Sequence, residues 1–263
     1  MIKAFNLDKF REKTLDIFYL TGEFTHLFIS TLKCSFSRPF YFGRLMEQIK
    51  ILGVGSISIT IVIGLTMGLV MTLNFGYGLK KFGGTMYVPA VVSLSLAREM
   101  APLFTSLIVA GRIGSGMAAE MGAMNVTQQV DAIRALGTSP LRILVVPRFW
   151  ASVISLPLLT ALSCALGIFG GFIVCLNEFG MPGGFYLYKV TSTVQLHDYM
   201  SGLVKSAIFG GMIAIIASYR SFKTRDGTRG VGDTTTWVVV TSSISILVVN
   251  FFVSKIFLVL WTK

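Results

Sequence analysis

Long apolar runs are the feature that most constrains how this chain can fold. The first run, residues 51–79, contains no Asp, Glu, Lys or Arg. About 20 apolar residues cross a bilayer as a helix. Strands of a membrane barrel would instead alternate polar and apolar residues over about ten positions, which these runs do not. The sequence therefore predicts an all-α polytopic membrane protein with five spanning helices, over residues 51–79, 88–111, 149–176, 203–219 and 237–260.

The composition indicates that lipid is part of the solvent of this chain. Hydrophobic residues make up 53% of its 263 residues and charged residues only 13%, whereas soluble domains carry roughly 25% charged residues. The net charge of +11 would suggest nucleic acid in a soluble protein. Here the basic residues cluster between apolar runs, so we predict no nucleic-acid partner. We interpret 1–263 as a single domain, with an N-terminal segment over 1–50 and a transmembrane core over 51–260.

The basic residues also predict an orientation, because loops on the cytoplasmic side are enriched in Lys and Arg. Eight of them lie in residues 1–50, and four follow each of the second and fourth spans. The N-terminus has no apolar signal segment and is expected on the cytoplasmic or stromal side, with the C-terminus opposite. The opposite side carries fewer basic residues, namely Lys80, Lys81, Lys189 and Lys263, with Lys205 and Lys255 near helix ends.

Residues 14–35 form an amphipathic segment before the first span. Their apolar stripe has helical spacing and consists of Ile17, Leu20, Phe24, Leu27 and Phe28. This period is typical of an interfacial helix that lies in the membrane plane. The alternative is a helix packed on the bundle.

Small residues recur inside the spans at helix-packing spacing. Gly64 and Gly68 form G-x-x-x-G in the first span, and further glycines occur at 167, 170, 171, 210 and 211. Small residues let helix backbones approach closely in lipid.

Arg98 and Glu99 interrupt the second span near its middle. A charge at the centre of a spanning helix costs about 2.5–3.5 kcal/mol on insertion scales, so such residues usually face a cavity or a partner. Neighbours on a helix point about 100° apart and cannot pair neatly with each other. Either they form a polar patch that meets a lipid headgroup, or they form ion pairs with another helix. Pro102 follows and should kink this helix, freeing backbone carbonyls.

The segment 118–144 predicts a short cytoplasmic helix of about three turns between spans two and three. Asn125 or Thr127 can cap its start and Gly137 suits its end. Val130, Ile133 and Leu136 give it one apolar face, flanked by Asp131 and Arg134. Such a helix either docks on a soluble partner or touches lipid headgroups.

The sequence contains no pattern for an active site, a metal site or an ATP site. Residues 221–236 are glycine-rich but lack the G-x-x-x-x-G-K-[ST] pattern, and we interpret them as a tight connection between spans four and five. His26 and His197 are isolated, and the three cysteines have no metal or redox spacing. We expect no catalytic residues, no metal and no cofactor, and any ATP must be hydrolysed by a separate subunit.

Several motifs resemble those of MlaE-type permeases, also called YrbE or Mce-associated permeases. In chain order they are LAREMAP (96–102), AGRIGS (110–115), AEMGAM (119–124), TQQVDA (127–132), PRFWA (147–151) and LPLL (156–159). The first resembles the family's L-x-R-E-x-x-P, and the fourth resembles its T-E-Q-[IL]-[DS]-A. The likeness extends from about residue 15 to 260, and its most specific part is 94–160.

The resemblance implies a permease subunit of an ATP-binding-cassette transporter that moves phospholipid or glycolipid between membranes. It implies five spanning helices after an interfacial helix, and a homodimer with a lipid cavity between the copies. Two cytoplasmic or stromal ATPase subunits and a ring of MCE-domain proteins would be its partners. Arg98 and Glu99 would face the lipid path. The residues that would form or flank the coupling helix at the ATPase are Glu120, Thr127, Gln129, Asp131, Arg134 and Gly137.

The family includes the permease of the plastid trigalactosyldiacylglycerol lipid importer. The resemblance therefore implies a bacterial inner membrane or a plastid inner envelope, and a cyanobacterial or plastid-encoded member. Two positions depart from the family pattern. Gln128 replaces the usual Glu at the expected ATPase contact, and Asn250 stands where an Asp is common in the last span.

Two other classes of function compete with this interpretation. The chain could be an ion-coupled secondary transporter that uses Arg98 and Glu99 as its coupling pair, although such folds usually contain internal repeats and five spans divide into none here. It could also be a scaffold that transports nothing, in which case two charges inside a span would have no purpose.

Overall fold

A computed structural model describes residues 22–35 and 41–261. The described residues are almost entirely helical and contain no strand. Besides the N-terminal helix over 22–35, the α-helices are α2 (Phe42–Leu52), α3 (Ile57–Lys80), α4 (Val88–Ser95), α5 (Ala101–Val109), α6 (Ser115–Val126), α7 (Gln129–Ala135), α8 (Val146–Asn177), α9 (Gly183–Thr193), α10 (Leu196–Ser221) and α11 (Gly227–Trp261).

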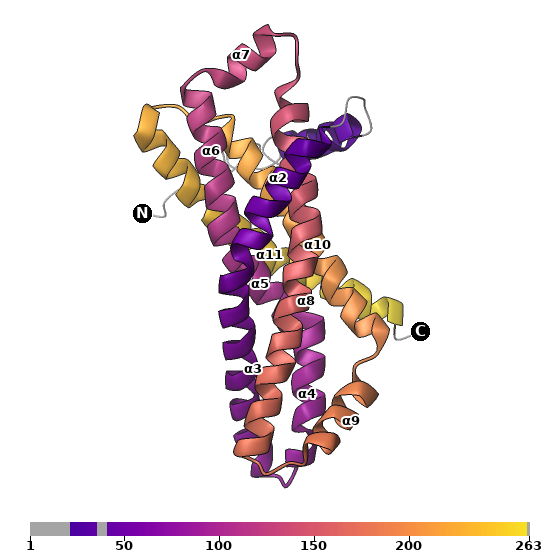
Figure 1. Ribbon diagram of the computed structural model, residues 1–263. Coiled ribbons are helices and arrows are strands. Elements are labelled where there is room, and N and C mark those ends of the chain that lie inside the picture. Colours follow the sequence, from indigo (N-terminus) through magenta and orange to yellow (C-terminus); the bar gives the residue numbers. More distant parts are fainter. Residues whose placement is uncertain (1–21, 36–40, 262–263) are drawn as a thin grey trace, which may run out of the picture.

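Five helical stretches of the described chain are long and apolar enough to cross a membrane, which confirms the five predicted spans. Each is longer than the apolar run that predicted it, because the helices continue into polar residues at their ends. Figure 1 shows a long bundle with α7 at one end and the short helix α9, which we did not predict, toward the other. The stretches are Phe42–Lys80, Thr85–Val126, Leu141–Asn177, Leu196–Ser221 and Gly227–Val259.

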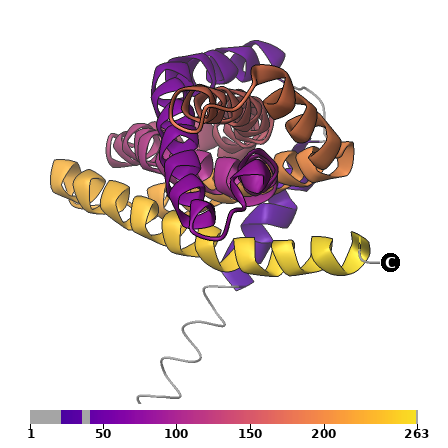
Figure 2. The same cartoon turned by 90° about the horizontal axis from the view of Figure 1, so that it is seen from below.

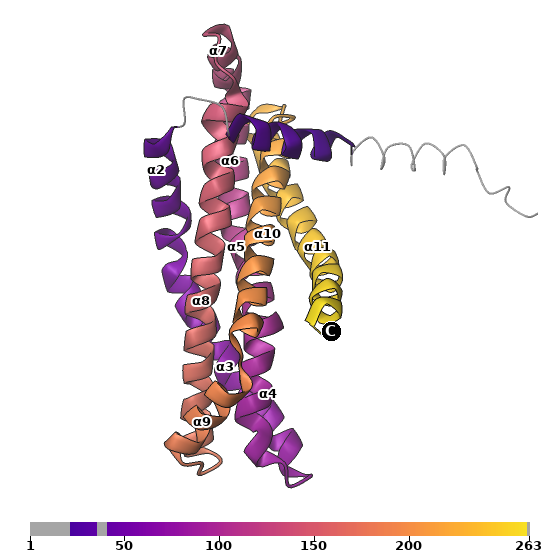
Figure 3. The same cartoon turned by 90° about the vertical axis from the view of Figure 1, so that its right-hand side faces the viewer.

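The N-terminal helix lies across the end of the bundle that carries α7, nearly perpendicular to α8 and α10 (Figures 1 and 3). This is the orientation expected of an interfacial helix, although residues 14–21 of the predicted segment lie outside the described residues. The helix also packs on the bundle. The rings of Phe24 and Tyr219 are 4.2 Å apart, and Trp150 donates a hydrogen bond of 3.0 Å to the Ser35 hydroxyl. The helix therefore lies crosswise, as the first alternative requires, and also packs on the bundle, as the second requires.

Close contact between α3 and α8 forms the centre of one half of the bundle. Gly64 and Gly68 of α3 lie against the backbone of α8 at Ser163 and Gly167. A Cβ atom at Gly64 would come within 2.7 Å of the Ser163 carbonyl oxygen, and one at Gly68 would overlap the Gly167 carbonyl. The predicted role of the G-x-x-x-G pair in helix packing is thus confirmed.

The connection between spans four and five is shorter than predicted. We expected a tight connection over residues 221–236, but only residues 222–226 lie between the two helices, and 227–236 form the first turns of α11. The reversal is made by Asp226 and Gly227, which both have positive φ, at 66° and 61°. Because these two residues complete the turn, the glycines at 230 and 232 are free to continue as helix.

Helix α11 crosses one face of the bundle obliquely and is its least covered span (Figures 1 and 2). Only 11% of its most apolar window is buried by the rest of the chain. Its outward side chains are apolar, as a surface in contact with lipid or with another apolar helix must be. The exposed ones include Val240, Ile244, Leu247, Val248, Phe251 and Phe252.

The glycine contact makes a specific prediction about stability. Gly68→Ala should destabilise the chain by about 1–3 kcal/mol, because the added methyl group forces α3 away from α8. Gly78→Ala is the matched control on the same helix, since a Cβ there would meet nothing within 4 Å. The midpoint of thermal unfolding in detergent should fall for Gly68→Ala and stay level or rise for Gly78→Ala. Equal midpoints would disprove the close contact.

Candidate functional site

The two charged residues inside the second span lie in a π-helical turn, Leu96–Met100, which separates α4 from α5. A turn of this kind is often found at functional sites in helices. Pro102 is the second residue of the following helix α5. Proline has no backbone N–H, so the carbonyl four residues earlier, that of Arg98, has no α-helical donor.

Helix α10 approaches this turn closely enough to supply the missing partners. Gly202 makes the approach possible, because a Cβ there would overlap the carbonyl of Ala97. Asp198 and Lys205 flank Gly202 on α10 and are spaced seven residues apart, about two helical turns. They therefore lie on the same side of α10, one opposite Arg98 and the other opposite Glu99.

Arg98 pairs with Asp198. Its Nε donates a hydrogen bond of 2.6 Å to Asp198 Oδ1, and the Asp198 side chain is only 2% exposed. The second carboxylate oxygen of Asp198 accepts the backbone N–H of Gln195 at 3.0 Å, which caps the start of α10. His197 Nε2 lies 3.2 Å from the same carboxylate. Asp198 thus stabilises the first turn of α10 and anchors it to the second span.

Lys205 is the most enclosed charge of the cluster, with 2% of its side chain exposed. Its Nζ donates to Glu99 Oε1 at 2.6 Å and to Ser254 Oγ of α11 at 2.9 Å. Its third hydrogen bond, also 2.9 Å, goes to the Arg98 carbonyl. That is the carbonyl left without an α-helical donor by Pro102, so the ammonium uses all three protons.

Glu99 receives hydrogen bonds from α11 as well. Its Oε2 accepts Asn250 Nδ2 at 3.2 Å and Ser254 Oγ at 3.1 Å. At position 250 an amide donates to Glu99, whereas an ionised carboxylate would repel it. The departure at Asn250 therefore adds a hydrogen-bond donor to the carboxylate that Lys205 also contacts.

A small cavity of about 140 Å³ opens onto this cluster, lined by Arg98, Glu99, His197, Ser201, Lys205 and Ser254 together with Phe257 and Leu258. The Arg98 and Glu99 side chains are each about a third exposed. Each ion pair is therefore buried on the α10 side and open on the other. Within apolar spans, the arrangement presents one guanidinium and one carboxylate to whatever polar group enters.

A model of the permease MlaE family matches residues 45–256. The chain belongs to the MlaE permease family. It is 37% identical to a probable ABC transporter permease protein of Synechocystis over 92% of this chain and 90% of the relative. It is 34% identical to the intermembrane phospholipid transport system permease MlaE of Haemophilus influenzae, over 82% and 83%. Arabidopsis thaliana protein TRIGALACTOSYLDIACYLGLYCEROL 1, chloroplastic, is 31% identical over 81% of this chain and 61% of its own length.

The expectation that Arg98 and Glu99 do not pair with each other is confirmed, since both pair with α10. Asp198, Lys205 and Ser254 were not predicted as partners in this MlaE-family site. Lys205 was predicted near a helix end, which is wrong, because it lies inside α10 and is buried. The seven-residue spacing of one acid and one base on the fourth span was the available signal. Whether Arg98 and Glu99 also line a lipid path stays a prediction.

Helix α7 projects beyond the bundle (Figure 1) and carries three of the six predicted coupling residues. Glu120 lies within α6, Thr127 directly follows α6, and Gly137 follows α7. Helix α7 has seven residues, about two turns instead of the expected three. The apolar residues predicted to share one face differ in burial, since Val130 is fully buried while Leu136, which directly follows α7, is 82% exposed. Gly137 has φ +73° and ends the helix as predicted. Gln129 is exposed, as are Asp131 and Arg134, which form an ion pair of 2.9 Å.

The predicted cap of this helix is wrong. Gln128, with φ 59°, precedes α7 and makes no side-chain capping bond. Asn125 instead donates to the carbonyls of Phe222 and Thr224, at 3.2 and 3.0 Å. Thr127 donates to the Ala123 carbonyl at 2.9 Å. Thr127 thus bonds back to the preceding turn of its own helix, whereas Asn125 joins the end of α6 to the connection before α11.

Glu120 has a partner that the motif did not reveal. Its Oε2 lies 2.8 Å from a guanidinium nitrogen of Arg148, which is 4% exposed, while half of the Glu120 side chain remains exposed. Arg148 also donates to the Leu144 carbonyl at 2.9 Å. The pair ties α6 to the start of α8 on either side of α7, so it stabilises the base from which α7 projects.

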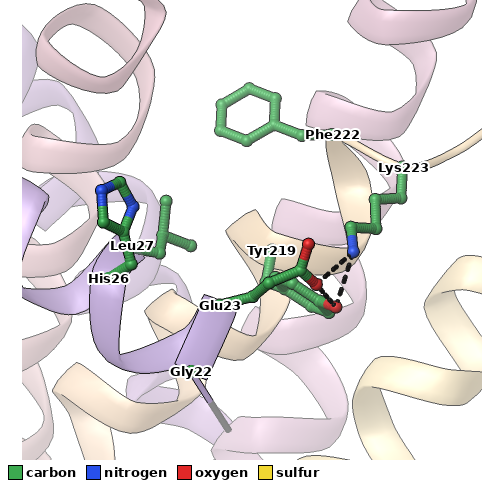
Figure 4. Close-up of a pocket in the computed structure, with 7 residues that line it drawn as sticks. All are labelled: Gly22, Glu23, His26, Leu27, Tyr219, Phe222 and Lys223. Carbon is green, nitrogen blue, oxygen red and sulfur yellow. Dashed lines mark hydrogen bonds and ion pairs between the residues drawn. The ribbon is translucent and has the colours of Figure 1, made fainter. Parts of the chain in front are cut away.

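The connection before α11 also holds the N-terminal helix (Figure 4). Glu23 accepts hydrogen bonds from Lys223 and from the Tyr219 hydroxyl. These bonds, that of Lys223 first, hold the pKa of Glu23 below its ordinary value. Lys223 Nζ and the Tyr219 hydroxyl oxygen lie 2.7 Å apart. The three side chains fasten the crosswise helix to the end of α10.

The Lys205 contacts predict a non-additive response to mutation. Lys205→Met should destabilise the chain by about 1–3 kcal/mol, less than the 3–5 kcal/mol for a fully buried pair because Glu99 is a third exposed. Glu99→Gln combined with Lys205→Met should recover part of that loss, since no charge then lacks its partner. Thermal unfolding of both single variants and the double variant in detergent measures these changes in stability. A double variant as unstable as the sum of the two would contradict the pairing.

Proposed function

We propose that this chain is the membrane-spanning subunit of an ATP-driven transporter that moves phospholipid or glycolipid between membranes. The observation that carries the proposal is the cluster of Arg98, Glu99, Asp198 and Lys205, which places charge inside apolar spans and opens it to a cavity. Charges there are unfavourable unless they are paired or functional, and this cluster leaves two paired charges accessible. Membership of the MlaE permease family supports the transport of lipid.

In this proposal Arg98 and Glu99 contact the polar headgroup as it passes. The guanidinium suits a phosphate, because it donates in a planar fork. The carboxylate suits a hydroxyl or amine donor. The lipid tails would stay against apolar side chains, so only the headgroup needs a polar surface within the membrane.

The energy would come from a separate subunit, since the sequence has no P-loop pattern and no ATP site. We propose that α7 docks on that ATPase, with the exposed Leu136 as the apolar contact and Asp131 and Arg134 beside it. Glu120, Thr127, Gln129 and Gly137 hold or flank this docking helix. The departure at Gln128 leaves the contact without one acidic charge.

We further propose that two copies assemble through apolar spans and that an MCE-domain protein receives or delivers lipid on the far side. The uncovered apolar face of α11 is compatible with a second copy. The N-terminus would face the cytoplasm or stroma and the C-terminus the opposite side, in a bacterial inner membrane or a plastid inner envelope. The excess of basic residues on the α7 side supports this orientation.

The docking assignment predicts which variants lose the ATPase. Arg134→Glu and Gly137→Pro should each lower the ATPase recovered with the tagged chain by about ten-fold or more, through a reversed charge and a broken helix end. Membrane insertion should be unchanged. Lys81→Glu, exposed beyond α3 at the opposite end of the bundle, is the control. Normal recovery of the complex with both variants would refute docking through α7.

Transport itself is tested with the complex purified in mild detergent and reconstituted into liposomes that hold a fluorescent phospholipid. ATP should drive the lipid to acceptor vesicles, and Arg98→Gln with Glu99→Gln should reduce transfer to the level without ATP. Lys81→Gln should leave transfer unchanged. Transfer that needs no ATPase but collapses with the proton gradient would establish an ion-coupled transporter instead. Unchanged transfer by the double variant would remove the cluster from the path.

A further inference from the structure

A second cavity, of about 690 Å³, lies between the N-terminal helix and helices α8, α10 and α11. Phe24 and Phe28 of that helix line it on one side, and side chains of α8, α10 and α11 line the other sides. We call it the subhelical groove. Apart from Thr25, Thr241 and Ser245 its lining is apolar or glycine. It shares no residue with the charged cluster.

The depth of the subhelical groove follows from the helix above it. An interfacial helix buries its apolar face about 5–10 Å into the boundary between headgroups and acyl chains. Phe24 and Phe28 are on that face, whereas Glu23 and His26 face the other cavity, shown in Figure 4. A groove directly beneath Phe24 and Phe28 therefore begins at the level where acyl chains begin.

Aromatic and basic side chains lie next to the groove without lining it, one helical turn beyond Ile216 on α10 and one turn before Thr241 on α11. Trp237 lies one turn before Thr241 on α11, and its ring is 6.5 Å from that of Tyr219. The Arg220 guanidinium lies over the Trp237 ring, 5.2 Å from its centre. Among the described residues no carboxylate forms an ion pair with Arg220, and its buried Nε has no hydrogen-bond partner. Aromatic and basic side chains of this kind are typical of the membrane interface.

We propose that the subhelical groove binds one acyl chain of a lipid from the same leaflet, with the anionic headgroup beside Arg220. The apolar lining of the groove suits an acyl chain, and the unpaired guanidinium of Arg220 suits a phosphate. A second copy of the protein is the weaker occupant, because a helix about 10 Å across would have to enter beneath the chain's own N-terminal helix. The proposal depends on the chain spanning a membrane and does not depend on the proposed transport.

The experiment places the photoreactive amino acid p-benzoylphenylalanine at Met212, inside the groove, or at Leu158 on α8. Leu158 is 64% exposed and lines no cavity described here. The chain is taken from nanodiscs of phosphatidylglycerol, washed in detergent so that only tightly held lipid remains, and irradiated. Intact mass spectrometry should find a lipid adduct at position 212 and none at 158. Ala207→Trp, which fills the groove, should abolish the adduct, and Leu158→Trp should not.

Three results would overturn the groove as a lipid site. They are equal adducts at both positions, no adduct at either, and an adduct between position 212 and protein, which would identify a second copy or another segment of this chain as the occupant. Because no ATPase or transport is needed, Glu99→Gln should leave the adduct unchanged even where transfer fails.

The headgroup is tested by repeating the labelling in nanodiscs of mixed phosphatidylglycerol and phosphatidylcholine. One basic side chain near the surface should give about a five-fold preference for the anionic lipid. Arg220→Gln should remove that preference and leave the adduct in place. A preference that survives Arg220→Gln would refute the role of this guanidinium.

Discussion

The rest of the bundle depends on the three hydrogen bonds that the Lys205 ammonium donates. Pro102 leaves the Arg98 carbonyl without an α-helical donor, and Glu99 adds a negative charge one residue later. In lipid no water can satisfy either group. Lys205 donates to both and to Ser254, so spans two, four and five are joined at one atom. The adjoining pair of Arg98 and Asp198 fixes the start of α10, and with it the register of the other contacts.

A second set of contacts connects α7 with the N-terminal helix at the same end of the bundle. Asn125 ties the end of α6, next to the projecting α7, to the connection over residues 222–226. Lys223 in that connection and the preceding Tyr219 hold Glu23 of the N-terminal helix. Helix α7 and the N-terminal helix are thus linked through four side chains, although the contacts join residues about 100 and 200 positions apart in sequence.

The particular successes and errors of sequence reasoning have a common cause. Long apolar runs predicted the spans, because insertion in lipid depends on local composition. Gly137 and the pair of Gly64 and Gly68 were assigned correctly, since positive φ and close packing both favour glycine. Lys205 was assigned to a helix end because the predicted fourth span began at residue 203, whereas α10 begins at Leu196. Its true position depends on a carboxylate and a carbonyl more than 100 residues away.

The sequence by itself determined that this chain crosses a membrane five times, that it carries a crosswise amphipathic helix, and that it belongs with MlaE-type permeases. These properties are local, because apolar length, helical period and short motifs are readable along one segment. Only the tertiary structure decided which charges meet, which carbonyl Lys205 satisfies, and where the groove beneath the N-terminal helix lies. Those depend on how the spans rotate against one another, and rotation is set by the sum of many packing contacts rather than by any one stretch of residues.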